Sequence, residues 1–170
     1  MIIAETNRLL LSKITVEDAP FLLELMNTPG WIKYIGDRNI KTVKQAETYI
    51  ENNQLKCYET HGFGYYKIQV KAENLKTIGT SGLLKRDNLD HVDIGFSFIP
   101  NYHGKGYGFE AASEIINLAK TKFNIKTLCA ITLPINQPSI HLLEKLGLSY
   151  QKTVKPFDND EELLLFAKNL

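Results

Sequence analysis

Hydrophobic and polar residues alternate in short runs through the middle of the chain and recur at helical spacing on either side of it. Residues 7–14 are predicted to form a first strand. Thr15, with Asp18 three residues later, predicts a capped helix start. A second helix is predicted over 42–56. The stretch between the two helices, 28–41, is predicted to be a loop that is too apolar to be only a connector.

The alternation in the middle of the chain predicts three short strands joined by polar turns, over 64–70, 77–84 and 91–98, which is typical of an antiparallel meander. The later pattern predicts a helix over 106–122, a strand over 126–132, a helix over 137–146 and strands over 148–154 and 162–168. A strand, a helix and a further strand imply a parallel crossover. We therefore expect a mixed α/β sheet that is antiparallel first and parallel in its middle.

Composition adds few constraints. A length of 170 residues predicts a single domain over 1–170. The hydrophobic fraction of 44% and the charged fraction of 23% are ordinary for a soluble globular protein. A net charge of +1 gives no general electrostatic reason to bind nucleic acid or membranes. No signal peptide or membrane span is predicted, so we expect a cytoplasmic protein.

The two cysteines give no sign of a metal or disulfide site. Cys57 and Cys129 form no CxxC pair, and Cys57 with His61 supplies only two of the four ligands that a zinc site requires. We expect two reduced cysteines and no bound metal.

The segment NYHGKGYG, residues 101–108, lies between a predicted strand and a predicted helix. The first N–H groups of a helix have no internal partner, and the helix dipole favours an anion beside them. Glycine allows close approach of the backbone and positive φ, and Lys105 adds a charge. The segment therefore predicts a site for a phosphorylated ligand, although a tight turn that uses glycine for geometry alone is the alternative.

Two other phosphate-binding motifs fit less well. The Walker pattern GxxxxGK[ST] is absent. Residues 106–111 fit the dinucleotide pattern GxGxxA, but the strand that follows ends in ITLPIN without an acidic residue, and an antiparallel meander precedes the loop. A nicotinamide oxidoreductase is therefore a weakened alternative.

Three segments resemble the GNAT superfamily of N-acetyltransferases, and the order of elements resembles it over nearly the whole chain. They are ETNRLLLSKITVEDAPFL, DIGFSFIPNYHGKGYGFEA and ITLPINQPSIHLLEKLGL. Ser139 and the sequence PNYHGKGY favour the ribosomal-protein N-terminal acetyltransferase-like (RimJ/RimL-type) branch. The resemblance implies the GNAT fold, an α+β arrangement with a single mixed, mostly antiparallel sheet and helices on both faces.

The resemblance also implies a function, which is transfer of an acetyl group from acetyl-CoA to a primary amine by direct attack in a ternary complex. Phe98 and Ile99 would offer backbone groups to pantetheine and to the acetyl carbonyl, where a donor stabilises the oxyanion. Asn136 would reach the pantetheine arm. Backbone N–H groups would hold the pyrophosphate, from His103, Gly104, Lys105, Gly106, Tyr107 and Gly108.

The proton donor for the leaving thiolate is a departure from the family pattern. Many members carry a tyrosine seven residues past the asparagine, where this chain has Leu143. Ser139 is the candidate for that role and for cofactor contact, and its alternative role is to cap the helix after Pro138. His141 faces away from Ser139 and is predicted to be a surface residue.

Asp93 is the candidate base, at a place where the family often has a glutamate. The strand alternation puts it on the face opposite the predicted core residues Val92, Ile94, Phe96 and Phe98. An α-amine has a pKa of ~7.7–8.0, so a weak base acting through water suffices. The alternatives are an ordinary polar residue or a partner of a lysine, and His91 is a weaker candidate base. Tyr102 and His103 are expected to pack over CoA.

Trp31 and Tyr34 are the candidate acceptor-binding residues, within the segment 28–41, whose alternative role is a hydrophobic lid. This segment has one acid, Asp37, in its aromatic stretch, which favours a peptide N-terminus or a small amine of low charge. A non-catalytic CoA-binding sensor is the competing class, because Leu143 replaces the usual tyrosine. A homodimer is a family expectation.

Overall fold

The computed structural model describes residues 1–170 and contains one eight-stranded sheet, in the order β1-β2-β3-β4-β5-β6-β8-β7. The strands are β1 (Ile2–Glu5), β2 (Leu9–Lys13), β3 (Tyr65–Val70), β4 (Lys76–Leu84), β5 (Val92–Phe98), β6 (Thr127–Thr132), β7 (Ser149–Val154) and β8 (Leu163–Asn169). Only β5 and β6 run parallel. The mixed, mostly antiparallel sheet is therefore confirmed.

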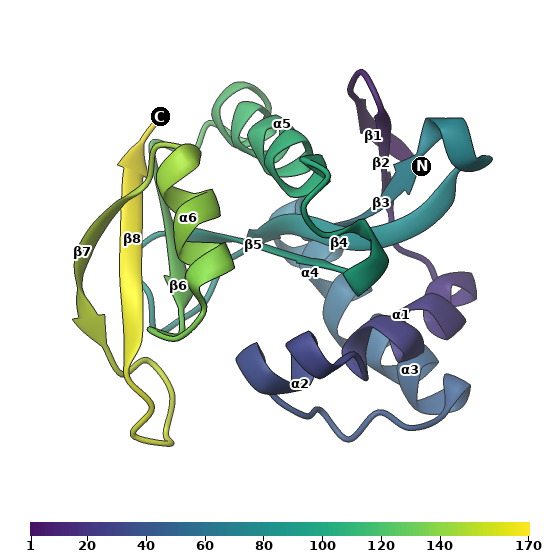
Figure 1. Ribbon diagram of the computed structural model, residues 1–170, viewed down its shortest axis with the longest axis horizontal. Helices are drawn as coiled ribbons and strands as arrows, with labels where there is room; N and C mark the ends of the chain where they lie inside the picture. Colours follow the sequence, from purple (N-terminus) through teal and green to yellow (C-terminus); the bar gives the residue numbers. More distant parts are fainter.

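Helices cover both faces of this sheet, as predicted (Figure 1). They are α1 (Ala19–Met26), α2 (Pro29–Tyr34), α3 (Val43–Ile50), α4 (Lys56–His61), α5 (Tyr107–Thr121) and α6 (Gln137–Lys145). Helix α5 packs on β2, β4 and β5, and α6 packs on β6 and α5. Figure 1 shows α1, α2 and α3 on the side away from α5. None of the helices combines the length and the apolar character needed to cross a bilayer.

The N-terminal part of the chain confirms one prediction and corrects two. The capping box of Thr15 and Asp18 is present, ahead of a short 3-10 turn that leads into α1. The chain opens with a strand that was not predicted, β1, which pairs with β2. The segment 28–41 is not only a loop, because Thr28 caps the short helix α2.

The helix predicted over 42–56 ends five residues later, at His61, and is not regular. Helix α3 passes into a π-helical turn over Glu51–Leu55 and then into α4, which ends at Gly62 with φ +76°. The predicted helix includes the π turn but stops at Lys56, the first residue of α4. The residues of the π turn are mostly polar and exposed, so they interrupt the apolar stripe that would predict a longer helix.

The sheet opens between β5 and β6. Their parallel pairing is limited to Val92 with Leu128 and Asp93 with Cys129. Beyond Asp93, β5 continues to pair with β4, whereas β6 pairs with β8. The result is a fork in the sheet that is closed at Asp93 and open toward Phe98. As predicted, Ile94 is a buried core residue, and Val92, Phe96 and Phe98 pack against the same core from partly buried positions.

Candidate active site

The glycine segment forms a turn that leads directly into α5. Gly104 and Gly106 have φ of +71° and +80°, a conformation that favours glycine. The first backbone hydrogen bond of the helix runs from Glu110 N–H to Gly106 O at 3.1 Å. The three preceding N–H groups, of residues 107–109, therefore have no carbonyl within the helix to bond. This arrangement can hold an anion at the helix start.

The open edge of β5 offers one of the two predicted backbone groups. Ile99 N–H donates to Ile78 O of β4 at 2.9 Å, so it is already bonded. Because neighbouring residues of a strand direct their hydrogen-bonding groups to opposite edges, the N–H of Phe98 points toward the fork. The Ile99 N–H is therefore not available to a cofactor, and Phe98 carries the available N–H; the cofactor contacts of both residues stay predictions.

His103 and Tyr102 were both expected to pack over CoA, and they take different positions. A ring nitrogen of His103, Nε2, lies 2.7 Å from Phe98 O and joins the loop to the end of β5. Tyr102 is buried, and its hydroxyl donates to Glu73 at 2.6 Å. The prediction for Tyr102 is wrong, because its ring belongs to the core rather than to the open surface.

The end of β5, the start of α5 and helix α6 meet at Gly108. A Cβ added at Gly108 would lie 3.3 Å from Leu142 Cδ2 and 3.6 Å from Phe98 Cε2. The missing side chain therefore allows α6 to approach the first turn of α5. Ser139 is three residues before Leu142, on the same face of α6, so it points toward this junction.

Asn136, rather than Ser139, caps helix α6. Asn136 Oδ1 accepts from Ser139 N–H at 3.3 Å and caps α6, which leaves its amide nitrogen available. The half-buried Ser139 hydroxyl makes no hydrogen bond within the protein. The capping alternative for Ser139 is thus filled by Asn136. Leu143 is buried, and His141 is exposed as predicted.

Asp93 is almost completely buried where the fork closes. Its carboxylate is paired with Arg86 Nε at 3.2 Å, an arginine rather than the lysine considered from the sequence. Burial raises the pKa of Asp93 to about 6, against the opposing effect of the Arg86 cation. A carboxyl with a pKa in this range is ionised at neutral pH and can still exchange protons.

Tyrosine and arginine side chains surround Asp93 on the face of α3 and α4. The Tyr65 hydroxyl occupies the space that a side chain at Gly95 would fill. Burial, and then the Asp93 charge, raise the pKa of Tyr65. Burial also raises the pKa of Tyr49, whereas the Arg38 and Arg86 cations lower it. The surroundings of Asp93 are therefore polar but partly closed to water.

Arg86 also joins Asp93 to the loop between β7 and β8. Its guanidinium lies 5.5 Å from the centre of the exposed Phe157 ring. Asn88, which lies with Arg86 in the loop between β4 and β5, donates to Pro156 O of the β7–β8 loop. The Asp93 carboxylate and the β7–β8 loop thus both contact Arg86, a residue that the sequence alone did not single out.

The predicted acceptor residues lie on α2. Trp31 and Tyr34 are half-buried, and Trp31 packs against the smaller core cluster formed mainly by α1 and α3. The indole N–H of Trp31 is buried without a partner. Asp37 is engaged by Asn39 N–H at 2.8 Å and by Lys41 at 3.4 Å. The acid of this segment is therefore occupied within the protein.

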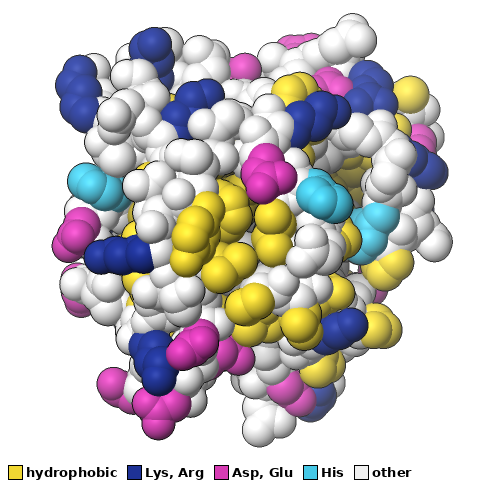
Figure 2. All heavy atoms as spheres, turned by 60° about the vertical axis from the view of Figure 1, so that its left-hand side comes forward, with side chains coloured by type: hydrophobic (Ala, Val, Ile, Leu, Met, Phe, Trp, Pro, Cys, Tyr) yellow, Lys and Arg dark blue, Asp and Glu magenta, His cyan; other side chains and the backbone are white.

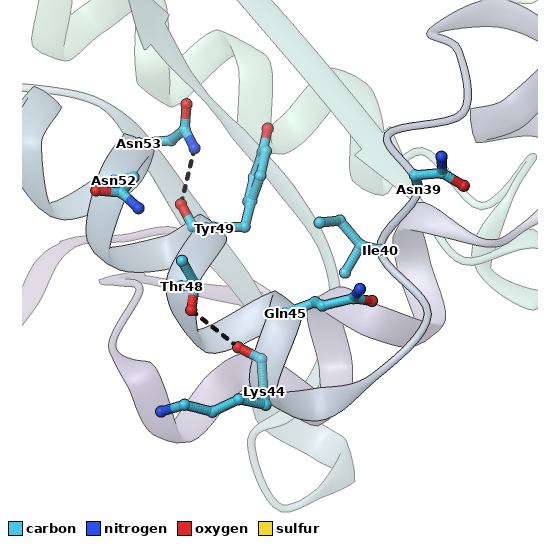
Figure 3. Close-up of a pocket in the computed structure, with 8 residues that line it drawn as sticks. All are labelled: Asn39, Ile40, Lys44, Gln45, Thr48, Tyr49, Asn52 and Asn53. Atoms are coloured by element: carbon cyan, nitrogen blue, oxygen red, sulfur yellow. Dashed lines mark hydrogen bonds between the residues drawn. The ribbon is translucent and has the colours of Figure 1, made fainter.

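A groove of about 390 Å³ runs between α3 with its π turn and the segment before α3 (Figure 3). Its lining is Asn39, Ile40, Lys44, Gln45, Thr48, Tyr49, Asn52 and Asn53. In Figure 3, Tyr49 stands between the two asparagines of the π turn and Ile40. Lys44 is the single charged residue of the lining, so the groove is nearly neutral.

Figure 2 shows the molecule turned toward the side of α6, β7 and β8. Hydrophobic side chains gather across the centre of this face, with acidic and basic side chains around them. Apolar areas rimmed by polar residues are typical of surfaces that bind ligands or other proteins.

A family model for the acetyltransferase (GNAT) domain matches residues 8–149. The chain belongs to the GNAT acetyltransferase family. It is 29% identical over 162 residues to the uncharacterized N-acetyltransferase p20 of Bacillus licheniformis, covering 94% of this chain and 89% of that protein. It is 30% identical over 156 residues to the uncharacterized N-acetyltransferase YjdG of Bacillus subtilis (strain 168), covering 86% and 89%.

Solved GNAT structures have the same fold. The ribosomal-protein-S5-alanine acetyltransferase of Vibrio fischeri superposes with a TM-score of 0.82 at 20% identity, over 99% of this chain and 96% of that chain. The microcin C7 self-immunity acetyltransferase MccE, solved with acetyl-CoA and AMP, has a TM-score of 0.80 at 17% identity, over 97% and 94%. The predicted GNAT fold is confirmed.

This GNAT protein transfers an acetyl group from acetyl-CoA to an amine, and acetyl-CoA is its co-substrate. No group of three or more His, Cys, Asp or Glu side chains gathers to hold a metal ion.

Proposed function

We propose that the protein acetylates a primary amine of low charge, foremost the N-terminal amine of a peptide, by direct attack in a ternary complex. The fork between β5 and β6 carries this proposal. Its open edge presents the Phe98 N–H beside α6, and Asp93 stands where it closes. Two roles of a transferase site, an oxyanion donor and a base, therefore lie along one strand.

The donor half would bind acetyl-CoA chiefly through backbone. The N–H groups of Gly104 to Gly108 hold the pyrophosphate, and the exposed Lys105 adds a charge. The prediction for the His103 N–H is corrected, because this group already donates to Pro100 O at 3.0 Å. Asn136 directs its amide nitrogen to the pantetheine arm. The Phe98 N–H donates to the acetyl oxygen as negative charge develops there.

Two side chains would move the protons. Asp93 takes the proton from the attacking amine through water, because it is ionised above its pKa of about 6. Ser139 donates its hydroxyl proton to the departing sulfur. A bond forms between the amine nitrogen and the acetyl carbon, the carbon–sulfur bond breaks, and CoA leaves as the thiol. Asp93 then releases its proton to water and Ser139 takes one up, which restores both groups.

The acceptor half would hold the body of the amine between α2 and α3. Trp31 and Tyr34 supply aromatic walls, and the nearly neutral groove lined by Asn39 and Asn52 supplies amide groups that can pair with peptide bonds. A polyamine or aminoglycoside would require several free carboxylates. Asp37 is already bonded, which supports an acceptor of low charge.

The two cysteines are both unpaired, which supports a reducing cytoplasmic setting. A homodimer stays an expectation of the family resemblance, and light scattering of the purified protein would test it.

The test is an acceptor panel with acetyl-CoA, read by mass spectrometry. The panel contains a peptide with a free N-terminus, the same peptide blocked at its N-terminus and carrying one lysine, spermidine and an aminoglycoside. We expect the free N-terminus to gain one acetyl group and the other acceptors to stay unmodified. Acetylation of spermidine or the aminoglycoside alone would contradict the proposal. Binding of CoA without turnover on any amine, extended to small amines, would favour a CoA-binding module.

A further inference from the structure

Arg8 and Glu110 join the N-terminal hairpin to the first turn of α5. Arg8 lies in the turn between β1 and β2, and its Nε is 2.6 Å from Glu110 Oε2. The backbone N–H of Arg8 donates to Glu110 Oε1 at 2.8 Å, and the Thr6 hydroxyl donates to the same oxygen at 2.7 Å. Both oxygens of Glu110 are therefore bonded to the hairpin.

The same arginine holds the glycine loop itself. Arg8 Nη1 donates to Lys105 O at 3.0 Å. Its guanidinium lies 4.4 Å from the centre of the Tyr107 ring, and a Cβ at Gly106 would lie 3.3 Å from Nη2. One side chain thus contacts three consecutive residues of the loop. Its own backbone is fixed, because Arg8 O accepts from Lys71 N–H at 3.0 Å.

Glu110 lies in the first turn of α5, where a free carboxylate would affect the binding of an anion. An acid in the first turn of a helix is attracted to the free N–H groups there and competes with any other anion for them. Here the hydrogen bonds to Thr6 and Arg8 lower the pKa of Glu110, against the opposing effect of burial, and keep its carboxylate on the hairpin. The N–H groups at the start of α5 stay available.

We propose that Arg8 is a positioning residue for CoA binding: it keeps the Glu110 carboxylate away from the start of α5, neutralises its charge and fixes the carbonyl of Lys105. This inference rests on the proposed role of residues 103–108 as the pyrophosphate site. Arg8 acts on the phosphate half of the donor alone, and the pantetheine half lies along the fork beyond its reach.

The experiment compares the dissociation constants of CoA and of pantetheine, which has the same thiol arm without the nucleotide. In Arg8→Met, the CoA value rises about 10-fold, the scale of one lost charge-assisted hydrogen bond, and the pantetheine value stays unchanged. Arg8→Lys recovers part of the loss, because it restores the charge without the fork of donors. The matched control is Lys13→Met on the same hairpin, whose ammonium faces the Tyr58 ring; both constants stay at their original values.

A double variant tests the electrostatic step. Adding Glu110→Gln to Arg8→Met removes the unbalanced carboxylate, so CoA binds more tightly than to Arg8→Met alone. Equal or weaker binding by the double variant overturns that step.

Three further results test the role of Arg8 and the assignment of the pyrophosphate site. An unchanged CoA constant in Arg8→Met overturns the inference, and so does an equal rise for CoA and pantetheine, which indicates a general loosening of the fold. Gly106→Asp serves as the reference. If it weakens CoA binding and Arg8→Met does not, the role of Arg8 alone fails. If neither variant weakens CoA binding, the pyrophosphate assignment fails as well.

Discussion

The proposed donor side and the proposed acceptor side of this transferase consist of different chemical groups. The donor side consists of backbone groups: two glycines with positive φ, the first turn of α5 and the open edge of β5. The acceptor side consists of side chains carried by α2, α3 and the loops after β4 and β7. A backbone site tolerates side-chain change but not a change of conformation, whereas a side-chain site can change its ligand without changing the fold.

The largest effect that this comparison predicts is at Gly106. Gly106→Asp places a side chain at φ +80° and adds a negative charge where the pyrophosphate is proposed to bind. The new carboxylate also competes with Glu110 for Arg8, so CoA binding is expected to be lost. Thermal unfolding measures it: CoA at 100 times its dissociation constant stabilises by about 2.7 kcal/mol, a rise of roughly 5–10 °C that the variant lacks.

Gly62→Asp is the matched control. Gly62 has φ +76°, ends α4 and has open space around it, so the substitution adds the same kind of backbone strain away from the loop. A normal CoA shift for Gly106→Asp would mean that the phosphates do not bind at this turn.

The sequence was sufficient to predict the glycine turn before α5 because the information there is local. Three glycines between a strand and a helix constrain the backbone whatever the rest of the chain does. The exceptions are long-range: Ile99 N–H is bonded to Ile78 on another strand, and Arg8 reaches Glu110 across 102 residues. The pairing of strands and side chains at such separations has no periodic signal.

The second effect concerns proton transfer to sulfur. Ser139→Ala should lower kcat by about 100-fold, the lower range for loss of a general acid, and leave the CoA dissociation constant nearly unchanged. The fold should be preserved, since Asn136 rather than Ser139 caps α6. Steady-state kinetics with the acceptor found in the panel measure it. The exposed His141→Ala, on the same helix, is the control, and an unaltered kcat in Ser139→Ala would remove the serine from the chemistry.

The third effect is on the pH dependence of kcat/KM. The rate is expected to rise with pH through about 6 as Asp93 ionises. Arg86 lowers this pKa, so Arg86→Met should move the rise to higher pH by about one unit, and Asp93→Asn should abolish it. The facing groups Tyr65 and Cys129 have raised pKa values and stay neutral over this range. A profile that does not move in Arg86→Met would contradict the assignment of the base.

The same carboxyl predicts a pH dependence of stability. The pKa of Asp93 is raised in the folded state, from 3.8 to about 6, so its neutral form favours folding. This contribution is present below about pH 3.8 and is lost as the pH rises through about 6. Asp93→Asn keeps a neutral side chain at every pH and should therefore remove the loss between these values. Denaturant unfolding at pH 4 and pH 7 would measure the difference.

The acceptor side could be predicted only in outline. Trp31, Tyr34 and Asp93 were singled out, and their roles stay predictions, as does the single-domain organisation. Arg86 and Phe157 come together from two loops, and Tyr49 lines the groove beside the π turn that follows α3. Each placement depends on tertiary contacts that the hydrophobic pattern does not encode.

The smallest predicted effect is in the groove beside that π turn. Asn52→Leu should raise the acceptor KM a few-fold, about the value of one hydrogen bond, with kcat and CoA binding unchanged. Asn52 lines the groove whose amide groups are proposed to pair with peptide bonds. Asn117→Leu, on the exposed face of α5, is the control for adding an apolar surface residue. If both variants leave the acceptor KM unchanged, the acceptor does not bind in this groove. Its alternative place is along the β7–β8 loop, where Phe157 and Arg86 meet.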